Sequence, residues 1–301
     1  MNAILILALM LAAPAQSGPP GLAQVLAAKD QAKQGKFAEA AEILDRALAA
    51  EPNAGPGVYL LLADCRANLN QKDEAIAAGE RGLKLHPNSG PLSKRVGEML
   101  FQQNYTSKRA GELLAKAAKA LPNDPATHHL RGQWALLNHL EEIAIAAENR
   151  ALALAGSNNL ARMQIYTVLG LAEDALKRSL RAEAAFRRAW EINRKLPAPN
   201  PDAALELALF LLRQSRESDA QKVVDSIVAF APNFSPARLE RAKRLAAQGE
   251  MEKALGEANL ALDHADQPKT LRAAHAFLAK TYFALGRTEE ATSHQNWIES
   301  H

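Results

Sequence analysis

The sequence has few aromatic residues, a single cysteine and little net charge. Aromatic side chains make up 5% of 301 residues, and the net charge is +3 at pH 7. β-Sandwiches and barrels depend on aromatic and β-branched residues, so this composition argues against an all-β fold. At 48% hydrophobic residues, the chain is also far from the composition of disordered proteins. Its core must therefore be built from small side chains.

The lone cysteine, Cys65, excludes an internal disulfide bond. Proteins of oxidising compartments either use disulfides or avoid cysteine, and this chain avoids it. Because Cys65 lies beside Leu61, Leu62 and Ala63 in an apolar stretch, we expect a small buried side chain rather than a reactive thiol.

Long apolar runs are missing except at the N-terminus. Residues 3–13 are all apolar, but a bilayer core takes roughly 20 residues to cross. The run leads into Ala13-Pro14-Ala15, a small-x-small cleavage pattern. We interpret residues 1–15 as a signal peptide cut after Ala15 and residues 16–20 as the tail of the mature chain. This predicts a secreted or periplasmic protein with no stable membrane span.

Two alternatives remain for this N-terminus, because Met1-Asn2 lacks the usual Lys or Arg. The run could be an apolar helix packed on the first repeat, or an uncleaved anchor. A chain that is not processed would be a cytoplasmic protein.

Small residues recur in two columns along the remaining sequence. The first column is Ala40, Ala75, Ala110, Ala144, Ala182, Ala220, Ala254 and Ala291. The second lies about 12 residues upstream and is Ala28, Ala63, Gly97, Gly132, Gly170, Ala208, Ala242 and Ala279. Helices whose axes cross about 8–10 Å apart need Ala or Gly at the contact. The columns therefore predict repeated pairs of antiparallel helices.

The turns between the paired helices carry their own signals. Gly35, Gly249, Gly286 and Asn70 tolerate the left-handed backbone with which a helix ends. Prolines stop the second helix of several pairs, because proline cannot continue a helix; they are Pro52, Pro87, Pro122 and Pro232.

This pattern resembles the tetratricopeptide repeat family. One good copy is Tyr166, Leu169-Gly170, Ala182, Phe186 and Ala189, and another is Tyr59, Leu62-Ala63, Ala75 and Pro87. Some copies depart from it: Gly79 and Glu148 replace the aromatic residue of the second helix, and Arg131 and Arg241 replace the leucine of the first. The resemblance implies an all-α fold, a right-handed superhelical solenoid of antiparallel helix pairs.

The resemblance covers residues 21–301 as one solenoid of eight helix pairs. The expected pairs are 21–54, 56–89, 90–123, 125–158, 163–196, 201–234, 235–268 and 272–301. Two joints are longer than the others, at residues 155–159 and 196–201. We interpret both as loops within one array, with a hinge at 196–201 as the alternative.

The resemblance also implies a concave groove lined by the first helices. The groove positions include Lys29, Lys33, Asp64, Asn68, Lys94, Glu98, Gln102, His129, Gln133, Asp174, Arg213, Lys243 and Lys280. Basic residues outnumber acidic ones, so the expected partner is a protein or peptide segment of acidic character. The alternative is that these side chains are the solvated faces of amphipathic helices.

No catalytic, metal or cofactor motif stands out. The sequence has no Gly-x-Ser-x-Gly elbow, phosphate-binding loop, His-Glu-x-x-His or Cys-x-x-Cys. His128 and His275 fall at packing positions, where we expect half-buried side chains. Arg238, Arg241, Lys243 and Arg244 cluster, but Glu240 interrupts them. Nucleic acid is therefore a weak candidate.

The sequence thus predicts a non-catalytic exported scaffold, without catalytic residues, metal or cofactor, that assists envelope assembly or secretion machinery. The alternatives are a regulatory subunit or unrecognised enzyme of the cell envelope, and a cytosolic adaptor. Nothing in the sequence fixes the oligomeric state.

Cleavage of the leader can be tested directly. We expect the protein isolated from its native cells to begin at Gln16, because signal peptidase cuts after the small-x-small motif. Mass spectrometry of the intact protein measures this, and a chain that retains Met1 would contradict export by cleavage.

Overall fold

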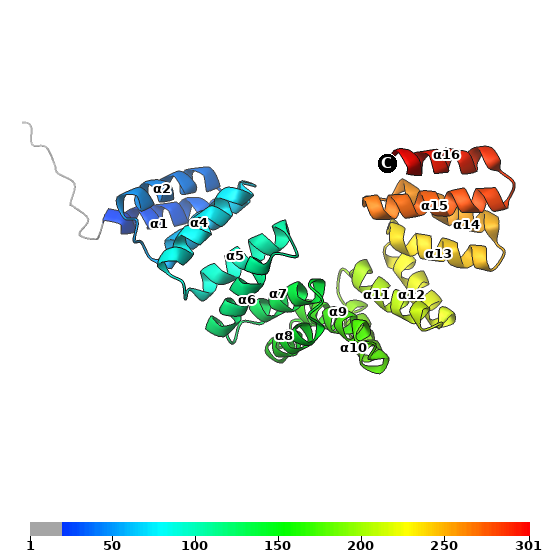
Figure 1. The fold of residues 1–301 in the computed structure, drawn as a ribbon, viewed down its shortest axis with the longest axis horizontal. Helices are drawn as coiled ribbons and strands as arrows, with labels where there is room; N and C mark the ends of the chain where they lie inside the picture. The colour runs from blue at the N-terminus through cyan, green and yellow to red at the C-terminus, as the bar shows by residue number, and fades with distance from the viewer. Residues whose placement is uncertain (1–19) are drawn as a thin grey trace, which may run out of the picture. The chain divides into compact units, whose positions relative to one another are not determined.

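The computed structural model describes residues 20–301, and every regular element in that range is an α-helix (Figure 1). The helices are α1 (Pro20–Lys33), α2 (Phe37–Ala50), α3 (Pro56–Asn68), α4 (Lys72–Leu85), α5 (Gly90–Gln103), α6 (Lys108–Ala120), α7 (Pro125–Leu137), α8 (Glu141–Leu154), α9 (Asn159–Ala175), α10 (Ser179–Asn193), α11 (Pro201–Arg213), α12 (Glu217–Phe230), α13 (Ser235–Ala247), α14 (Met251–Asp263), α15 (Pro268–Ala284) and α16 (Thr288–Ser300). The expected all-α fold is confirmed.

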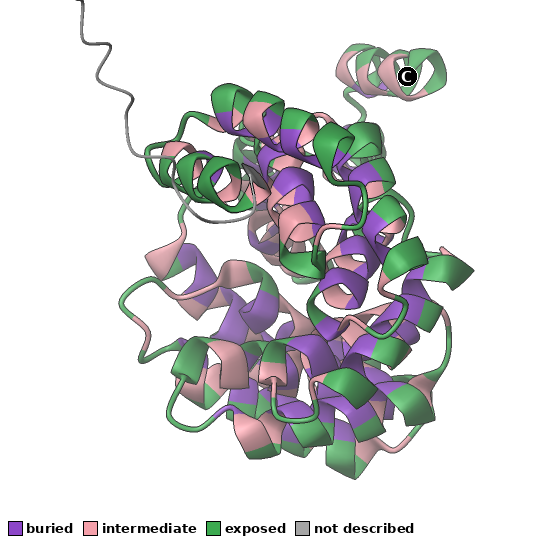
Figure 2. Ribbon diagram, turned by 90° about the vertical axis from the view of Figure 1, so that its left-hand side faces the viewer, coloured by how far each residue is buried: buried purple, intermediate pink, exposed green. Residues whose placement is uncertain are grey.

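Both small-residue columns lie in the core. Every alanine of the two columns is at most 9% exposed, and the three glycines are buried as well. Figure 2 shows the buried positions as stripes along the helices, with exposed positions on the opposite faces. The core is therefore a series of helix contacts rather than one central cluster of large side chains.

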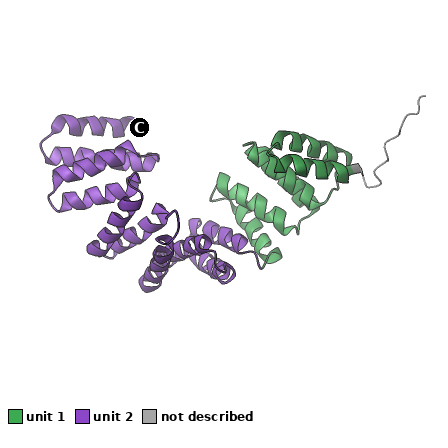
Figure 3. Cartoon of the chain, turned by 180° about the vertical axis from the view of Figure 1, so that it is seen from behind, with its two compact units in different colours: residues 1–122 green, residues 123–301 purple. Residues whose placement is uncertain are grey.

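The helices pack as consecutive pairs within two compact units (Figure 3). The unit of residues 1–122 holds the pairs from α1 to α6, and the unit of residues 123–301 holds those from α7 to α16. In each unit, the second helix of a pair also packs on the first helix of the next. The described range thus contains eight helix pairs, and within each unit the consecutive pairs stack as expected for a solenoid.

Two glycines show how close the paired helices approach. A Cβ on Gly170 of α9 would lie 2.6 Å from the Phe186 ring of α10. A Cβ on Gly132 of α7 would collide with the Glu148 side chain of α8. A small residue on the first helix therefore makes room for a large one on the second.

Most of the turns inside the pairs contain one residue with left-handed backbone. Gly35, Gly249, Gly286 and Asn70 have φ between 59° and 81°, as their sequence predicted. His139, Lys177 and Ser215 adopt the same conformation, which the sequence did not reveal because such residues are uncommon there. The same turn is therefore built with or without glycine.

The two longer joints differ from each other. The extra residues near 155–159 lengthen the first helix of the fifth pair, so α9 begins at Asn159 rather than at the expected 163. The Asn158 side chain caps this helix by accepting a hydrogen bond from the Ala161 amide at 3.1 Å. α15 likewise begins at Pro268, before the expected start of the eighth pair at 272.

The joint at 196–201 is a loop held by a buried asparagine. Asn193 is fully buried; its amide donates to the Asn200 carbonyl at 2.8 Å, and its Oδ1 accepts from the Asn200 amide at 2.7 Å. Asn200 in turn caps α11 through the Ala203 amide at 2.9 Å. These hydrogen bonds connect the end of α10 to the start of α11 across the loop.

The last helix is held by an aromatic cluster. Nδ1 of His275 on α15 lies 2.8 Å from Nδ1 of His294 on α16, so one imidazole donates and the other accepts. Trp297 stacks on His275 with ring centroids 3.9 Å apart. Burial lowers the pKa of both histidines, and His294 lowers that of His275 further. Both rings are therefore predominantly neutral at pH 7.

The expected packing roles of Cys65 and of two histidines are confirmed, although the histidines are buried rather than half-buried. Cys65 is fully buried and free, and burial raises the pKa of its thiol. His128 and His275 are 8% and 9% exposed. All three side chains act in packing.

The close approach at Gly170 gives a test. We expect Gly170→Ala to destabilise the protein by about 1–3 kcal/mol, because the added methyl group overpacks the contact with Phe186. Gly256 on α14 has open space around it, so Gly256→Ala should be neutral or stabilise by up to about 1 kcal/mol through helix propensity. Urea unfolding of both variants measures this, and equal midpoints would contradict the contact.

Candidate functional site

The acidic groove residues of the first unit are engaged by one arginine. Arg95 of α5 donates from Nε to Asp64 at 2.6 Å and from Nη1 to Glu98 at 3.1 Å. Asn68 donates to the Asp64 backbone carbonyl at 2.8 Å. These predicted site residues therefore form an interaction network on α3 and α5.

Three of the six basic groove residues form ion pairs with neighbouring carboxylates. The ion pairs are Lys33 with Asp30 at 3.6 Å, Arg213 with Asp174 at 2.7 Å and Lys243 with Glu240 at 2.6 Å. Lys94 is half-buried. Within residues 20–301, Lys29 and Lys280 make no hydrogen bond or ion pair. Neighbouring carboxylates thus hold three of these basic residues, while Lys29 and Lys280 are not held in this way.

A shallow hollow of about 420 Å³ lies on α1 and α3. Val25, Val58 and Leu61 give it an apolar floor. Lys29 and Asp64 also line it. Two predicted groove residues of the first unit therefore share one surface.

The remaining predicted residues are dispersed. Gln102 lines a smaller hollow beside Arg95 and Met99. Gln133 is half-buried on α7. Lys280 lines a hollow on α15 and α16 next to Phe283, which is 72% exposed. The structure thus spreads these residues over separate hollows.

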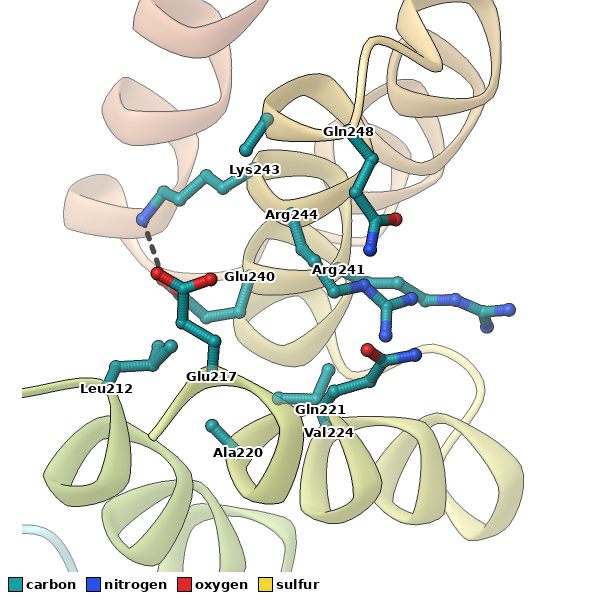
Figure 4. Close-up of a pocket in the computed structure, with 11 residues that line it drawn as sticks. Leu212, Glu217, Ala220, Gln221, Val224, Glu240, Arg241, Lys243, Arg244 and Gln248 are labelled. Atoms are coloured by element: carbon teal, nitrogen blue, oxygen red, sulfur yellow. Dashed lines mark hydrogen bonds and ion pairs between the residues drawn. The ribbon is translucent and has the colours of Figure 1, made fainter. Parts of the chain in front are cut away.

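A further candidate is a cleft of about 280 Å³ between α12 and α13 (Figure 4). Leu212, Ala220 and Val224 contribute apolar surface to it. Glu217 and Glu240 lie at one end, where Glu240 pairs with Lys243. The other lining residues are Gln221, Arg241, Arg244, Ala247 and Gln248. An apolar surface thus lies between acidic and basic ends.

Asp225 holds the basic end in place. Its Oδ1 lies 3.5 Å from Arg241 Nε, and its Oδ2 lies 3.3 Å from Arg244 Nη1. The Nε atoms of both arginines are buried and make no hydrogen bond within the described residues. Gln221 and Gln248 lie close to the two guanidinium groups (Figure 4). This end of the cleft can donate hydrogen bonds to a ligand carbonyl or carboxylate.

The sequence indicated these arginines only as an interrupted basic cluster. Arg238 also belongs to it and pairs with Glu257 of α14 at 2.7 Å. Acidic residues on α12 and α14 thus neutralise charge in this cluster. The cluster therefore gives no support to a polyanionic partner such as nucleic acid. The cleft itself could not be found from sequence, because its walls come from three helices.

A buried carboxyl group lies inside the fourth helix pair. Glu148 of α8 is fully buried, and both its oxygens lie 2.9–3.0 Å from Nδ1 of His129. Burial raises the pKa of Glu148 to about 7, and His129 opposes that shift. His129, predicted to line the groove, instead satisfies this carboxyl group. The only sequence signal for this buried carboxyl group was that Glu148 replaces the aromatic residue of the second helix.

No group of three or more His, Cys, Asp or Glu within 20–301 is placed to hold a metal ion. In the same range, no helix combines the length and apolar character needed to cross a bilayer.

Comparisons with known proteins support the tetratricopeptide repeat resemblance. The model of the tetratricopeptide repeat family matches residues 31–96. A search of curated proteins finds no match. Many solved structures have a similar fold, and three of them illustrate it.

A tetratricopeptide repeat protein from Parabacteroides merdae ATCC 43184 is 15% identical, with a TM-score of 0.63 over 84% of this chain and 98% of its own. PilW, described as a widely conserved type IV pilus biogenesis factor, is 15% identical, with a TM-score of 0.58 over 72% of this chain and 96% of its own. MamA from Desulfovibrio magneticus RS-1 is 23% identical, with a TM-score of 0.52 over 60% of this chain and 98% of its own. These likenesses show the fold.

The buried carboxyl group gives a pH-dependent prediction. A folded-state pKa near 7, above the ordinary value of 4.5, favours folding below pH 4.5, and this advantage is lost as the pH rises through 7. The free energy of unfolding should therefore decrease by up to about 3 kcal/mol between pH 5 and 8. In urea titrations, the free energy of unfolding of the Glu148→Gln variant should change less with pH over this window.

The matched control is Glu289→Gln, which changes an exposed glutamate of α16. It should keep the pH dependence of the unmodified protein. The prediction is wrong if Glu148→Gln keeps that dependence as well.

Proposed function

Because the chain is built from tetratricopeptide repeats, we propose that it is an exported, non-catalytic scaffold that holds a segment of a partner protein. Helix-pair repeats present long surfaces suited to such segments. The observation that carries the proposal is the cleft between α12 and α13, whose apolar floor lies between charged ends. Ligand sites commonly combine an apolar surface with a few converging polar groups.

The composition of the cleft defines the segment. An apolar side chain of the partner lies on Leu212 and Val224. Arg241 and Arg244 donate to an acidic or carbonyl group on one side of it, and Glu217 faces a basic or amide group on the other. The preferred segment thus carries charges of both signs around an apolar residue, in a helical or extended form. This segment differs from the partner of acidic character that the predicted groove residues favour.

The exported location rests on the N-terminal sequence. Residues 3–13 and the motif Ala13-Pro14-Ala15 support a cleaved leader. In a bacterium the mature protein would act in the periplasm or envelope. The fold it shares with PilW, a pilus biogenesis factor, is compatible with a role in envelope assembly.

A bulky residue in the cleft tests the proposal. Ala247 is exposed at the end of α13 and lines the cleft, so Ala247→Trp should fill it without disturbing an ion pair. We expect this variant to lose at least about tenfold in binding to the partners that the unmodified protein captures from an envelope fraction, as a blocked anchor would.

Ala229→Trp is the matched control, because Ala229 is exposed on α12 and does not line the cleft. It should capture the same partners as the unmodified protein. Circular dichroism checks that both variants remain folded. Undiminished capture by Ala247→Trp would overturn the assignment of the cleft.

A further inference from the structure

A hollow of about 390 Å³ on α15 and α16, the last helix pair described, has an incompletely covered apolar surface. Phe283, Gln295 and Ile298 are among the residues that line it. Ile298 lies seven residues after the first-column alanine of its pair and is half-buried. In the seven preceding pairs the residue at this position, from Ala47 to Ala261, is buried. We call this surface the end hollow.

Between internal pairs, the first helix of the next pair covers the equivalent surface. On α4, the residues equivalent to Gln295 and Ile298 are Gly79 and Gly82. A Cβ on Gly82 would lie 3.0 Å from Leu92 of α5, and a Cβ on Gly79 would collide with a valine of the same helix. α5 thus packs closely on these two positions of α4, and it packs on α3 as well.

A second joint has the same arrangement. The equivalent of Gln295 on α10 is Phe186, whose ring centroid lies 5.4 Å from that of Phe210 on α11, the first helix of the next pair. The end hollow therefore has the geometry of a site for one further first helix.

α1 presents the surface that such a helix needs. Ala23 and Ala27 are exposed, although the equivalent residues of α5, Leu92 and Val96, are buried against α4. Leu26 is 53% exposed. Residues three and four positions apart share one face of a helix, so these three side chains of α1 lie together. We call Ala23, Leu26 and Ala27 the α1 face.

We propose that the α1 face of one copy packs into the end hollow of a second copy, so that copies associate head to tail. This contact repeats the joint between neighbouring pairs, and the sizes of the side chains agree with it. Ile227 is the equivalent of Ile298 in the sixth pair, and Ala237 of α13, at the position of Ala23, lies in the same core cluster. An alanine of the incoming helix thus packs with an isoleucine in both cases.

Two exposed apolar side chains cover each other in this contact. Leu26 corresponds to Arg95 and Phe283 corresponds to Ala67, and Arg95 and Ala67 line one hollow. Leu26 of the incoming helix therefore meets Phe283, which is 72% exposed in the single chain. Removal of apolar surface from water favours such an association.

This self-association is independent of the proposed function. The α1 face and the end hollow share no residue with the α12–α13 cleft. A head-to-tail contact uses two different surfaces, so copies add in a row or close into a ring. The assembly would present one cleft per copy.

Sedimentation velocity tests the proposal. The chain beginning at residue 16 retains all of residues 20–301 and lacks the apolar leader, which could itself associate. We expect its sedimentation coefficient to rise between about 10 and 500 μM, because a contact of one helix is weak. Leu26→Lys and Phe283→Lys should each weaken association at least about tenfold, because each places an ammonium group in the apolar contact beside Lys280.

A mixture of the two variants gives the sharper result. Each variant keeps one unmodified surface, so the Leu26→Lys chain and the Phe283→Lys chain should form a dimer of one copy each and nothing larger. Leu180→Lys is the matched control, because Leu180 is 87% exposed on α10, outside both surfaces. It should associate like the unmodified chain, and circular dichroism should show all variants folded.

Three results would overturn the proposal. They are an unmodified chain that stays monomeric over this range, a mixture that forms no dimer, and an equal loss of association for Leu180→Lys. A monomeric chain would leave the end hollow to a helix of another protein. None of these results would affect capture of a partner segment through the α12–α13 cleft.

Discussion

The close contact between the two helices of each repeat is the constraint on which the rest of the structure depends. One side of the contact must be small wherever the other is large: Gly170 faces Phe186, and Gly132 faces Glu148. A close-packed interior tolerates neither overlap nor a void at such a point. The low aromatic content follows from this geometry, because most crossings leave room only for Ala or Gly.

The same constraint places a titratable group in the interior. Glu148 stands at the position that Phe186 occupies in the next repeat. It therefore fills space that an aromatic ring fills there. A buried carboxyl group needs a hydrogen-bond partner, and His129 supplies it from the facing helix. A residue that the sequence assigned to the groove is thereby used for the internal stability of one helix pair.

Neighbouring repeats are linked by arginine–carboxylate pairs, which also change the surface. Arg109 pairs with Glu80 at 3.0 Å, and Arg216 pairs with Glu183 at 2.6 Å. Such exposed pairs each contribute at most about 1 kcal/mol, but they neutralise charge that the sequence presents as free. The surface left for binding is therefore defined less by net charge than by hollows such as the α12–α13 cleft and by exposed side chains such as Phe283.

The sequence by itself determined the helix pairs, their number and their small contact positions, because helical periodicity, Gly turns and Pro stops are local signals. It did not determine the left-handed turns at His139, Lys177 and Ser215, the longer α9 and α15, or the asparagine that bridges the 194–200 loop. Only the tertiary structure decided which charges are free and where hollows form. Arg241 meets Asp225, and Asp64 meets Arg95, across different helices, and no local pattern encodes such distances.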